Sequence, residues 1–125
     1  MQTKPQGMID VIPVEQAKTL DGLFRERVQR SPENVAYRYF NAITEQWASY
    51  TWGEMNRFVS CWQAALGQET LVRGDRVAVM MRNCPEWVMF EQAALGLGLV
   101  VVPLYTEDRA ENAAYILQHS GAKVL

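Results

Sequence analysis

The stretch Gly74-Asp75-Arg76-Val77-Ala78-Val79-Met80-Met81 decides the fold of this chain, because a turn leads into a nearly continuous apolar run. Such a run is typical of a strand that is covered on both faces, as the strands of parallel sheets are. A helix is predicted next, from about Pro85 to Leu97. Asn83 can serve as its cap, Pro85 suits the first helical turn, and Gly98 can end it.

The same alternation repeats after this helix. Val100-Val101-Val102-Pro103 reads as a second buried strand, and Asp108 with Glu111 predicts a capping box before a helix of small apolar residues that would pack closely on the sheet. Gly121 can end that helix, and Lys123-Val124-Leu125 begins a third strand. The order β-α-β-α-β implies right-handed crossovers and a parallel sheet. We therefore predict an α/β fold with a truncated parallel sheet.

Two elements are predicted upstream of the sheet. Residues 35–40 and 47–51 are rich in aromatic and β-branched side chains, and the polar residues 41–46 between them suit the loop of a small β-hairpin. In Thr51-Trp52-Gly53-Glu54, the threonine and the glutamate form a capping box that opens an amphipathic helix.

The first part of the chain divides near residue 18. Residues 1–18 have no clear apolar period and contain two prolines, so we predict an extended arm there. From Thr19, which can cap an N-terminal helix, residues 19–125 are predicted to form one α/β domain that is incomplete at its C-terminal end. Arg25, Arg27 and Arg30 of that helix are expected to face water.

Composition excludes several classes of protein. The chain has 125 residues and a net charge of -2, and no basic block favours nucleic-acid binding. The longest apolar run, 95–104, is shorter than the roughly 20 residues that span a bilayer, and residues 1–10 do not resemble a secretory signal. A cytoplasmic location is therefore expected. Cys61 and Cys84 lack metal-site spacing and are predicted to be reduced packing residues.

Some residue patterns suggest sites but have simpler explanations. Gly96-Leu97-Gly98 would close a helix and precede a strand, which is the reverse of a dinucleotide loop, so packing and a helix stop explain it better. His119 is the sole histidine, and its place in a last helical turn favours a surface or capping role. Glu86 and Glu91 are five residues apart and do not share a helix face.

Aromatic residues and one strand end are the remaining candidates for ligand contact. Trp47, Trp52, Trp62 and Trp87, with the tyrosines, could supply stacking surfaces for a base or an acyl chain, although Trp52 and Trp62 are predicted to pack their helix onto the body. Pro103-Leu104-Tyr105-Thr106 leaves the carboxyl end of a parallel strand, where ligands of open α/β sheets usually bind. A rigid turn between strand and helix would use the same residues.

Several short motifs, taken together, resemble the N-terminal region of the adenylate-forming superfamily. The likeness covers roughly residues 19–125, in the right order and spacing. Among members of the superfamily, the chain looks most like AMP-forming long-chain fatty acid CoA ligases, also called acyl-CoA synthetases. The motifs are Tyr50-Thr51-Trp52-Gly53-Glu54, Gly74-Asp75-Arg76-Val77-Ala78, Asn83-Cys84-Pro85-Glu86-Trp87, Val101-Val102-Pro103-Leu104-Tyr105, and Tyr115-Ile116-Leu117 to Ser120-Gly121-Ala122.

The resemblance implies a two-step ligase reaction for a longer parent protein. A fatty acid is activated by Mg-ATP as an acyl-adenylate, and CoA then takes the acyl group. The family's phosphate loop, its aromatic-Thr-Glu segment, its ribose-binding acidic residue and its C-terminal lysine do not appear in this sequence. We therefore assign no catalytic, cofactor-binding or metal-binding residue to this chain and expect it to be catalytically silent. ATP, Mg²⁺ and CoA are implied for the parent alone.

Alternative interpretations remain open from the sequence. The parent could instead activate an aryl acid or an amino acid. A different class of protein, a free-standing α/β binding module of flavodoxin-like pattern, would use the last strand to pair with a partner. The expected partners are the remainder of the parent chain, its fatty acid and CoA. The chain is also expected to self-associate through its open sheet.

Overall fold

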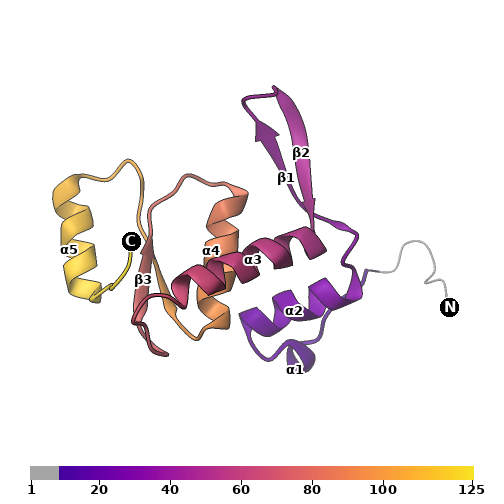
Figure 1. Ribbon diagram of the computed structural model, residues 1–125, viewed down its shortest axis with the longest axis horizontal. Coiled ribbons are helices and arrows are strands. Elements are labelled where there is room, and N and C mark those ends of the chain that lie inside the picture. The colour runs from indigo at the N-terminus through magenta and orange to yellow at the C-terminus, as the bar shows by residue number, and fades with distance from the viewer. Residues whose placement is uncertain (1–8) are drawn as a thin grey trace.

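The computed structural model describes residues 9–125, which form five helices and four strands (Figure 1). Residues 1–8, the first part of the predicted arm, lie outside the described range. The elements are α1 (Val14–Ala17), α2 (Leu20–Arg30), β1 (Val35–Asn41), β2 (Gln46–Thr51), α3 (Trp52–Leu66), β3 (Arg76–Val79), α4 (Pro85–Gly96), β4 (Val100–Pro103) and α5 (Ala110–Ser120). The predicted α/β class is confirmed.

A small parallel sheet carries the C-terminal half of the chain. β3 and β4 pair in parallel, with Val77 opposite Val101. The predicted third strand is present as a single parallel bridge between Val77 and Val124, with the N–H of Ala78 donating to the carbonyl of Val124 at 2.7 Å. β3 is therefore the middle element, and residues 77–79 are almost fully buried, as a strand covered on both faces should be.

The hydrophobic core lies between this sheet and the helices α3 and α4. Met55 of α3, Val77 of β3 and Ala93 of α4 are each 0% exposed. The capping box predicted at Thr51 and Glu54 is present, with the N–H of Glu54 donating to Thr51 Oγ1 at 3.2 Å and the N–H of Thr51 donating to Glu54 Oε2 at 2.8 Å. Both free N–H groups at the start of α3 are thus satisfied.

The β-hairpin rises from the start of α3 and projects away from the rest of the molecule (Figure 1). β1 and β2 are antiparallel, with Phe40 opposite Trp47, and a bulge interrupts the register between Val35 and Tyr37. The inner rings contact the body, because Tyr37 packs edge-on against Trp52 at a centroid distance of 5.9 Å. The predicted hairpin is confirmed.

The arm differs from the expectation in two ways. Residues Val14–Ala17 form the short helix α1, where an extended segment was predicted. Arg27 and Arg30 do not simply face water, since both guanidinium groups bind the Asp10 carboxylate, at 3.1 and 2.9 Å. Because these ion pairs join residues that are far apart in the sequence, the apolar periodicity of the helix could not predict them. The boundary at residue 18 as a domain division stays a prediction.

Two predicted caps are wrong. α4 begins after Cys84, whose side chain makes no capping bond, so Asn83 lies one residue too early to cap it. Pro85 does occupy the first turn, as predicted. α5 likewise begins one residue late for the proposed box, because Arg109 is its N-cap; Asp108 Oδ1 instead accepts from the Arg109 N–H and the Asn112 side chain, both at 2.8 Å.

Helix α5 also fails to pack as expected. None of its residues is buried, and it stands beside the narrow sheet (Figure 1). Two strands and a one-residue bridge offer too little surface to cover its apolar face. Gly121 ends the helix in the left-handed conformation, with φ 65°, as predicted. Among residues 9–125, no helix has the length and apolar character needed to cross a membrane.

Candidate functional site

The candidate site is a cleft of about 660 Å³ where β3 and β4 end. One wall follows β3 and the start of α4, and the other follows β4. Parallel strands place their carboxyl ends at the same edge of a sheet, which is where open α/β folds bind ligands. The lining residues are Met81, Arg82, Asn83, Trp87, Pro103, Leu104, Tyr105, Thr106 and Glu107.

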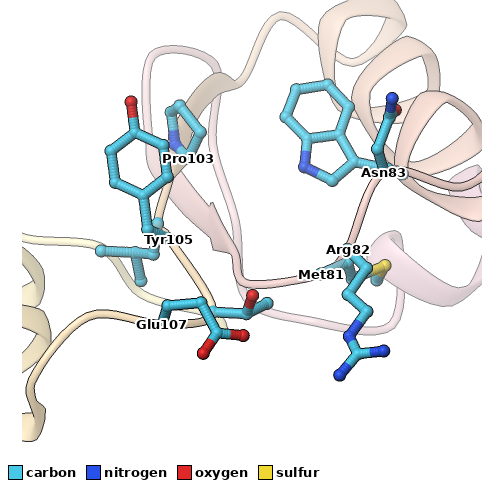
Figure 2. A pocket seen from close by; sticks show the side chains of 9 residues that line it. Met81, Arg82, Asn83, Pro103, Tyr105 and Glu107 are labelled. Carbon is cyan, nitrogen blue, oxygen red and sulfur yellow. The ribbon is translucent and has the colours of Figure 1, made fainter.

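The two walls are fixed to each other by the sheet. The N–H of Leu104 donates to the carbonyl of Val79 at 2.9 Å, and Leu104 is only 5% exposed, so it anchors the turn after β4. The next residue, Tyr105, is 82% exposed. Figure 2 shows Pro103 and Tyr105 on one side of the cleft and Asn83 on the other. The turn therefore presents an aromatic ring across from polar groups.

The cleft carries one charge of each sign. Arg82 lies on the β3 side and Glu107 on the β4 side, and both are exposed (Figure 2). A phosphate site needs several N–H donors and cations that converge on one point, and a magnesium site needs clustered oxygen ligands. Within residues 9–125 no group of three or more His, Cys, Asp or Glu side chains could hold a metal ion. These residues do not fit Mg-ATP by themselves.

The structure brings together part of the predicted site. Pro103-Leu104-Tyr105-Thr106 lines the cleft, as its position after a parallel strand suggests, and Trp87 faces the same space. Trp52 and Trp62 pack against the core, as predicted. Trp47 lies on the hairpin, where it is 65% exposed and pairs edge-on with Phe40. The four tryptophans therefore form no shared stacking surface.

The other predicted sites are dispersed. His119 stacks on Tyr115 at a centroid distance of 5.4 Å and is exposed in the last turn of α5. Glu86 lies at the start of α4, outside the cleft, and burial raises the pKa of Glu91. Cys61 is exposed and Cys84 is half-buried, and both thiols are free. Cys84 and Glu86 line one groove beside β1, whereas Cys61 and His119 lie on other helices, α3 and α5.

The glycines at the end of α4 have packing roles. A Cβ atom on Gly96 would lie 2.3 Å from Gln63 Nε2 and 2.9 Å from Asp21 Oδ1, so this glycine leaves room beside α4 for the ends of these two side chains. Gly98 adopts φ 73°, a conformation that favours glycine, and follows the helix end. The interpretation of Gly96-Leu97-Gly98 as a helix stop with close packing agrees with both observations.

Sequence reasoning missed half of the cleft. Met81, Arg82 and Asn83 follow β3 just as residues 104–106 follow β4, whose last residue is Pro103. The rule that ligands bind beyond the carboxyl ends of parallel strands applies to both segments, so it would have identified them. Glu107 had no comparable signal.

Comparison with known proteins gives the family. The family description "AMP-binding enzyme" matches residues 24–125. The chain is 32% identical over 108 residues to the long-chain-fatty-acid–CoA ligase FadD13 of Mycobacterium tuberculosis, covering 86% of this chain and 21% of that protein. It is also 30% identical over 129 residues to surfactin synthase subunit 2 of Bacillus subtilis, covering 99% of this chain and 3% of that protein.

Solved structures agree with the sequence matches. A fatty acyl CoA synthetase from Mycobacterium tuberculosis superposes with a TM-score of 0.75 at 31% identity, covering 86% of this chain and 21% of that one. The N-terminal subdomain of NpsA from Klebsiella oxytoca superposes with a TM-score of 0.74 at 27% identity, covering 85% of this chain and 26% of that one.

The chain spans about a fifth of the length of the ligase FadD13, and less of the surfactin synthase subunit. The family match, over residues 24–125, takes in most of α2, the hairpin and the parallel sheet. The chain belongs to the AMP-binding enzyme family, whose members include acyl-CoA ligases, and it has the fold of their N-terminal subdomain.

Proposed function

We propose that this chain is the N-terminal scaffold of a longer, AMP-forming ligase that activates a fatty acid and transfers it to CoA. The observation that carries the proposal is the 32% identity to the ligase FadD13 over 86% of the chain. A fatty acyl CoA synthetase with a TM-score of 0.75 supports the same parent. The remainder of the parent protein is then the main binding partner of this chain.

The parent reaction follows from the chemistry of acyl activation. A carboxylate oxygen attacks the α-phosphorus of ATP, the bond to the β-phosphate oxygen breaks, and pyrophosphate leaves with both bonding electrons. The CoA thiol then attacks the acyl carbonyl, loses its proton, and AMP leaves as the acyl–oxygen bond breaks. ATP supplies the activated leaving group, and Mg²⁺ neutralises phosphate charge when bound.

This chain contributes support rather than chemistry to that reaction. Its sequence contains neither a Ser/Thr/Gly-rich phosphate loop nor the other residues expected to bind ATP. The cleft at the ends of β3 and β4 has one cation, Arg82, opposite one carboxylate, Glu107. That pair is too sparse to stabilise a transferring phosphoryl group. The role left for residues 9–125 is to form a rigid wall that positions neighbouring parts of the parent.

A second candidate function is the same adenylate-forming reaction with a different carboxylic acid as the substrate. Relatives include NpsA, solved in complex with 3-hydroxyanthranilyl-AMSN, and two surfactin synthase subunits. An aryl acid or an amino acid would therefore replace the fatty acid. The free-standing flavodoxin-like module is less well supported, because the family match covers residues 24–125.

Pyrophosphate release tests the proposal at two levels. The 125-residue chain, incubated with ATP, Mg²⁺ and palmitate, should release no more pyrophosphate than a protein-free blank. The longer protein, expressed from the complete reading frame, should release pyrophosphate when given palmitate and should then consume CoA. Turnover by the short chain contradicts the scaffold role. Turnover of the long form with anthranilate or an amino acid, and not with palmitate, favours the second candidate.

A further inference from the structure

Residues 9–17 form a strap that lies against α2 (Figure 1). Of these residues only Ala17 is buried, and the apolar side chains of Ile9, Val11 and Val14 are 84%, 68% and 73% exposed. Burial of apolar surface is the main source of stability for a packed segment. The strap therefore lacks the hydrophobic attachment that holds α3, α4 and β3 together.

Polar side chains fasten the strap to α2. The two carboxylate oxygens of Asp10 bind Arg27 and Arg30, which lie in the last turn of α2. Gln16 donates to Glu26 at 2.6 Å and accepts from Arg30. The Arg27, Arg30 and Asp10 side chains are 22%, 24% and 26% exposed, so dissolved ions reach these pairs and screen them. The attachment should therefore weaken as ionic strength rises.

Lys18 joins the strap to α2 in a conformation that few residues other than glycine adopt. Its φ is 61° and its ψ is -40°, and the N–H of Thr19 donates to the carbonyl of Ala17 at 2.7 Å. A hydrogen bond between residues two apart, with a positive φ between them, makes the strained form of the γ-turn. Such strain persists only where surrounding contacts hold it. Release of the strap lets Lys18 relax.

Close contact between this turn and α2 depends on Gly22. A Cβ atom on Gly22 would clash with the backbone oxygen of Ala17 and lie 3.0 Å from its carbonyl carbon. Backbone atoms cannot rotate aside as the end of a flexible side chain can. The closed strap therefore requires glycine at this position, whereas alanine would favour the helix itself.

The strap also closes one side of a pocket of about 320 Å³. Residues 10–12 form that side, and α2, Tyr37, Trp52 and Gln92 form the rest. Phe24 of α2 is 6% exposed and packs edge-on against Trp52 at a centroid distance of 6.2 Å. Opening of the strap would remove one wall of the pocket and leave this aromatic contact in place.

We propose that the strap is a hinged cover over this pocket, latched by Asp10 and released by salt. It opens at Lys18 while α2 and the core stay folded. Strain at Lys18 favours the open state and the ion pairs of Asp10 favour the closed one, so ionic strength sets the balance between them. These contacts lie within residues 9–30, and the proposal depends neither on a partner nor on the acid that the parent activates.

Native-state hydrogen exchange of the 125-residue chain measures the opening. The N–H groups of residues 16–18 donate to the carbonyls of Pro13 and Val14, and a helix of four residues melts once it is released. These amides should exchange faster than residues 89–94 of α4, and about fivefold faster again when NaCl is raised from about 0.05 M to about 1 M. Exchange at the rate of α4, or no response to salt, would overturn the proposal.

A charge-matched pair of variants tests the latch. Asp10→Asn removes the carboxylate that binds both arginines and should speed exchange of the strap amides about fivefold or more at low salt. Glu33→Gln makes the same change of charge at an exposed site just after α2 and should leave this exchange unchanged. Equal effects of the two variants would reduce the latch to net charge and contradict the proposal.

Two further variants test the hinge. Gly22→Ala should hold the strap open, with the amides of residues 16–18 close to unfolded-chain rates and those of α4 still protected. Lys18→Gly relieves the strain and should slow exchange of the strap about twofold or more. Loss of protection in α4 on Gly22→Ala would show that the strap belongs to the core. Faster exchange on Lys18→Gly would contradict a strained hinge.

Discussion

The carboxylate of Asp75 lies 2.9 Å from Nζ of Lys123, across 48 positions of sequence. The same oxygen, Oδ2, accepts a hydrogen bond from the N–H of Val72 at 2.8 Å. Asp75 thus ties the turn before β3 to the segment that carries Val124. Nearby, Arg76 Nε donates to the carbonyl of Ser120 at 2.7 Å. Two side chains at the start of one strand therefore hold the C-terminal residues against the sheet.

Asp75 should make stability depend on acid pH. The Val72 N–H, followed by Lys123, lowers the pKa of Asp75 below its ordinary value. Its contribution to stability is therefore complete above the unfolded-state pKa of about 4 and is lost as pH falls through the folded-state pKa. Asp75→Ala should lower the melting temperature at pH 7, and the difference from the unmodified chain should shrink in strong acid.

Variants of Lys123 and Asp75 separate the contribution of the Asp75–Lys123 ion pair from that of the hydrogen bond between the Val72 N–H and Asp75. Lys123→Met should have a smaller effect than Asp75→Ala, because the Lys123 side chain is 51% exposed and the pair is partly screened. Asp75→Asn keeps an acceptor for the Val72 N–H and should fall between them. A melting-temperature difference that stays constant between neutral and acid pH would refute the linkage.

Removing Met55 should be among the most damaging single changes in the core. Its side chain is 0% exposed and belongs to the cluster between α3, α4 and β3. Met55→Ala should lower the free energy of unfolding by about 2–5 kcal/mol, from lost burial plus the cavity that remains. Urea unfolding measures the change. Ile43→Ala, at a site that is 94% exposed, should leave the midpoint nearly unchanged.

Gly96→Ala should change the free energy of unfolding by less than about 1 kcal/mol. The added Cβ would meet Gln63 Nε2 at 2.3 Å and Asp21 Oδ1 at 2.9 Å. Both atoms are the ends of flexible side chains, which can move aside at a small cost, and this cost offsets the gain of about 1 kcal/mol in helix propensity. Urea unfolding measures the change. Gln63→Ala in the same chain removes one of these contacts and should shift the balance toward stabilisation, whereas a loss of about 2 kcal/mol or more on Gly96→Ala would show that the side chains cannot move aside.

Tyr50 should titrate late in alkali. The rings stack at a centroid distance of 5.1 Å with their hydroxyl oxygens 3.3 Å apart. This hydrogen bond, followed by burial, raises the pKa of Tyr50 to about 12. Stability from this group is complete below the unfolded-state pKa of about 10 and is lost as pH rises through the folded-state value. Tyr39→Phe should lower the Tyr50 pKa, measured by phenolate absorbance.

Local signals in the sequence predicted the elements well. The capping box of Thr51 and Glu54 acts over three residues and is found as predicted. Gly121 ends α5 in the left-handed conformation because few other residues adopt it cheaply. The Asp108 box failed by a single residue, since Arg109 became the N-cap. Sequence patterns that extend over three or four residues therefore identify a helix reliably, but they locate its first residue less well.

Contacts between distant segments were not predictable from one sequence. Asp10 meets Arg27 and Arg30 only after α2 has placed both arginines on one side, next to the arm. The cleft was half predicted, because Pro103–Thr106 follows a recognisable strand. Its opposite wall, residues 81–83, follows the other parallel strand, so the same rule would have indicated it, whereas no pattern in the sequence marked Glu107.

Self-association is expected through a second groove, of about 490 Å³, beside the Val124 bridge. Its lining is almost entirely apolar, includes Trp62, Phe90 and Leu125, and has Glu69 as its one charged residue. Leu125 is 68% exposed, so water contacts apolar surface that another molecule could cover. Light scattering across a dilution series should therefore show mass rising with concentration. Leu125→Lys should reduce this rise, whereas Ile43→Lys on the hairpin should not. A strictly monomeric sample at all concentrations would exclude association through this groove.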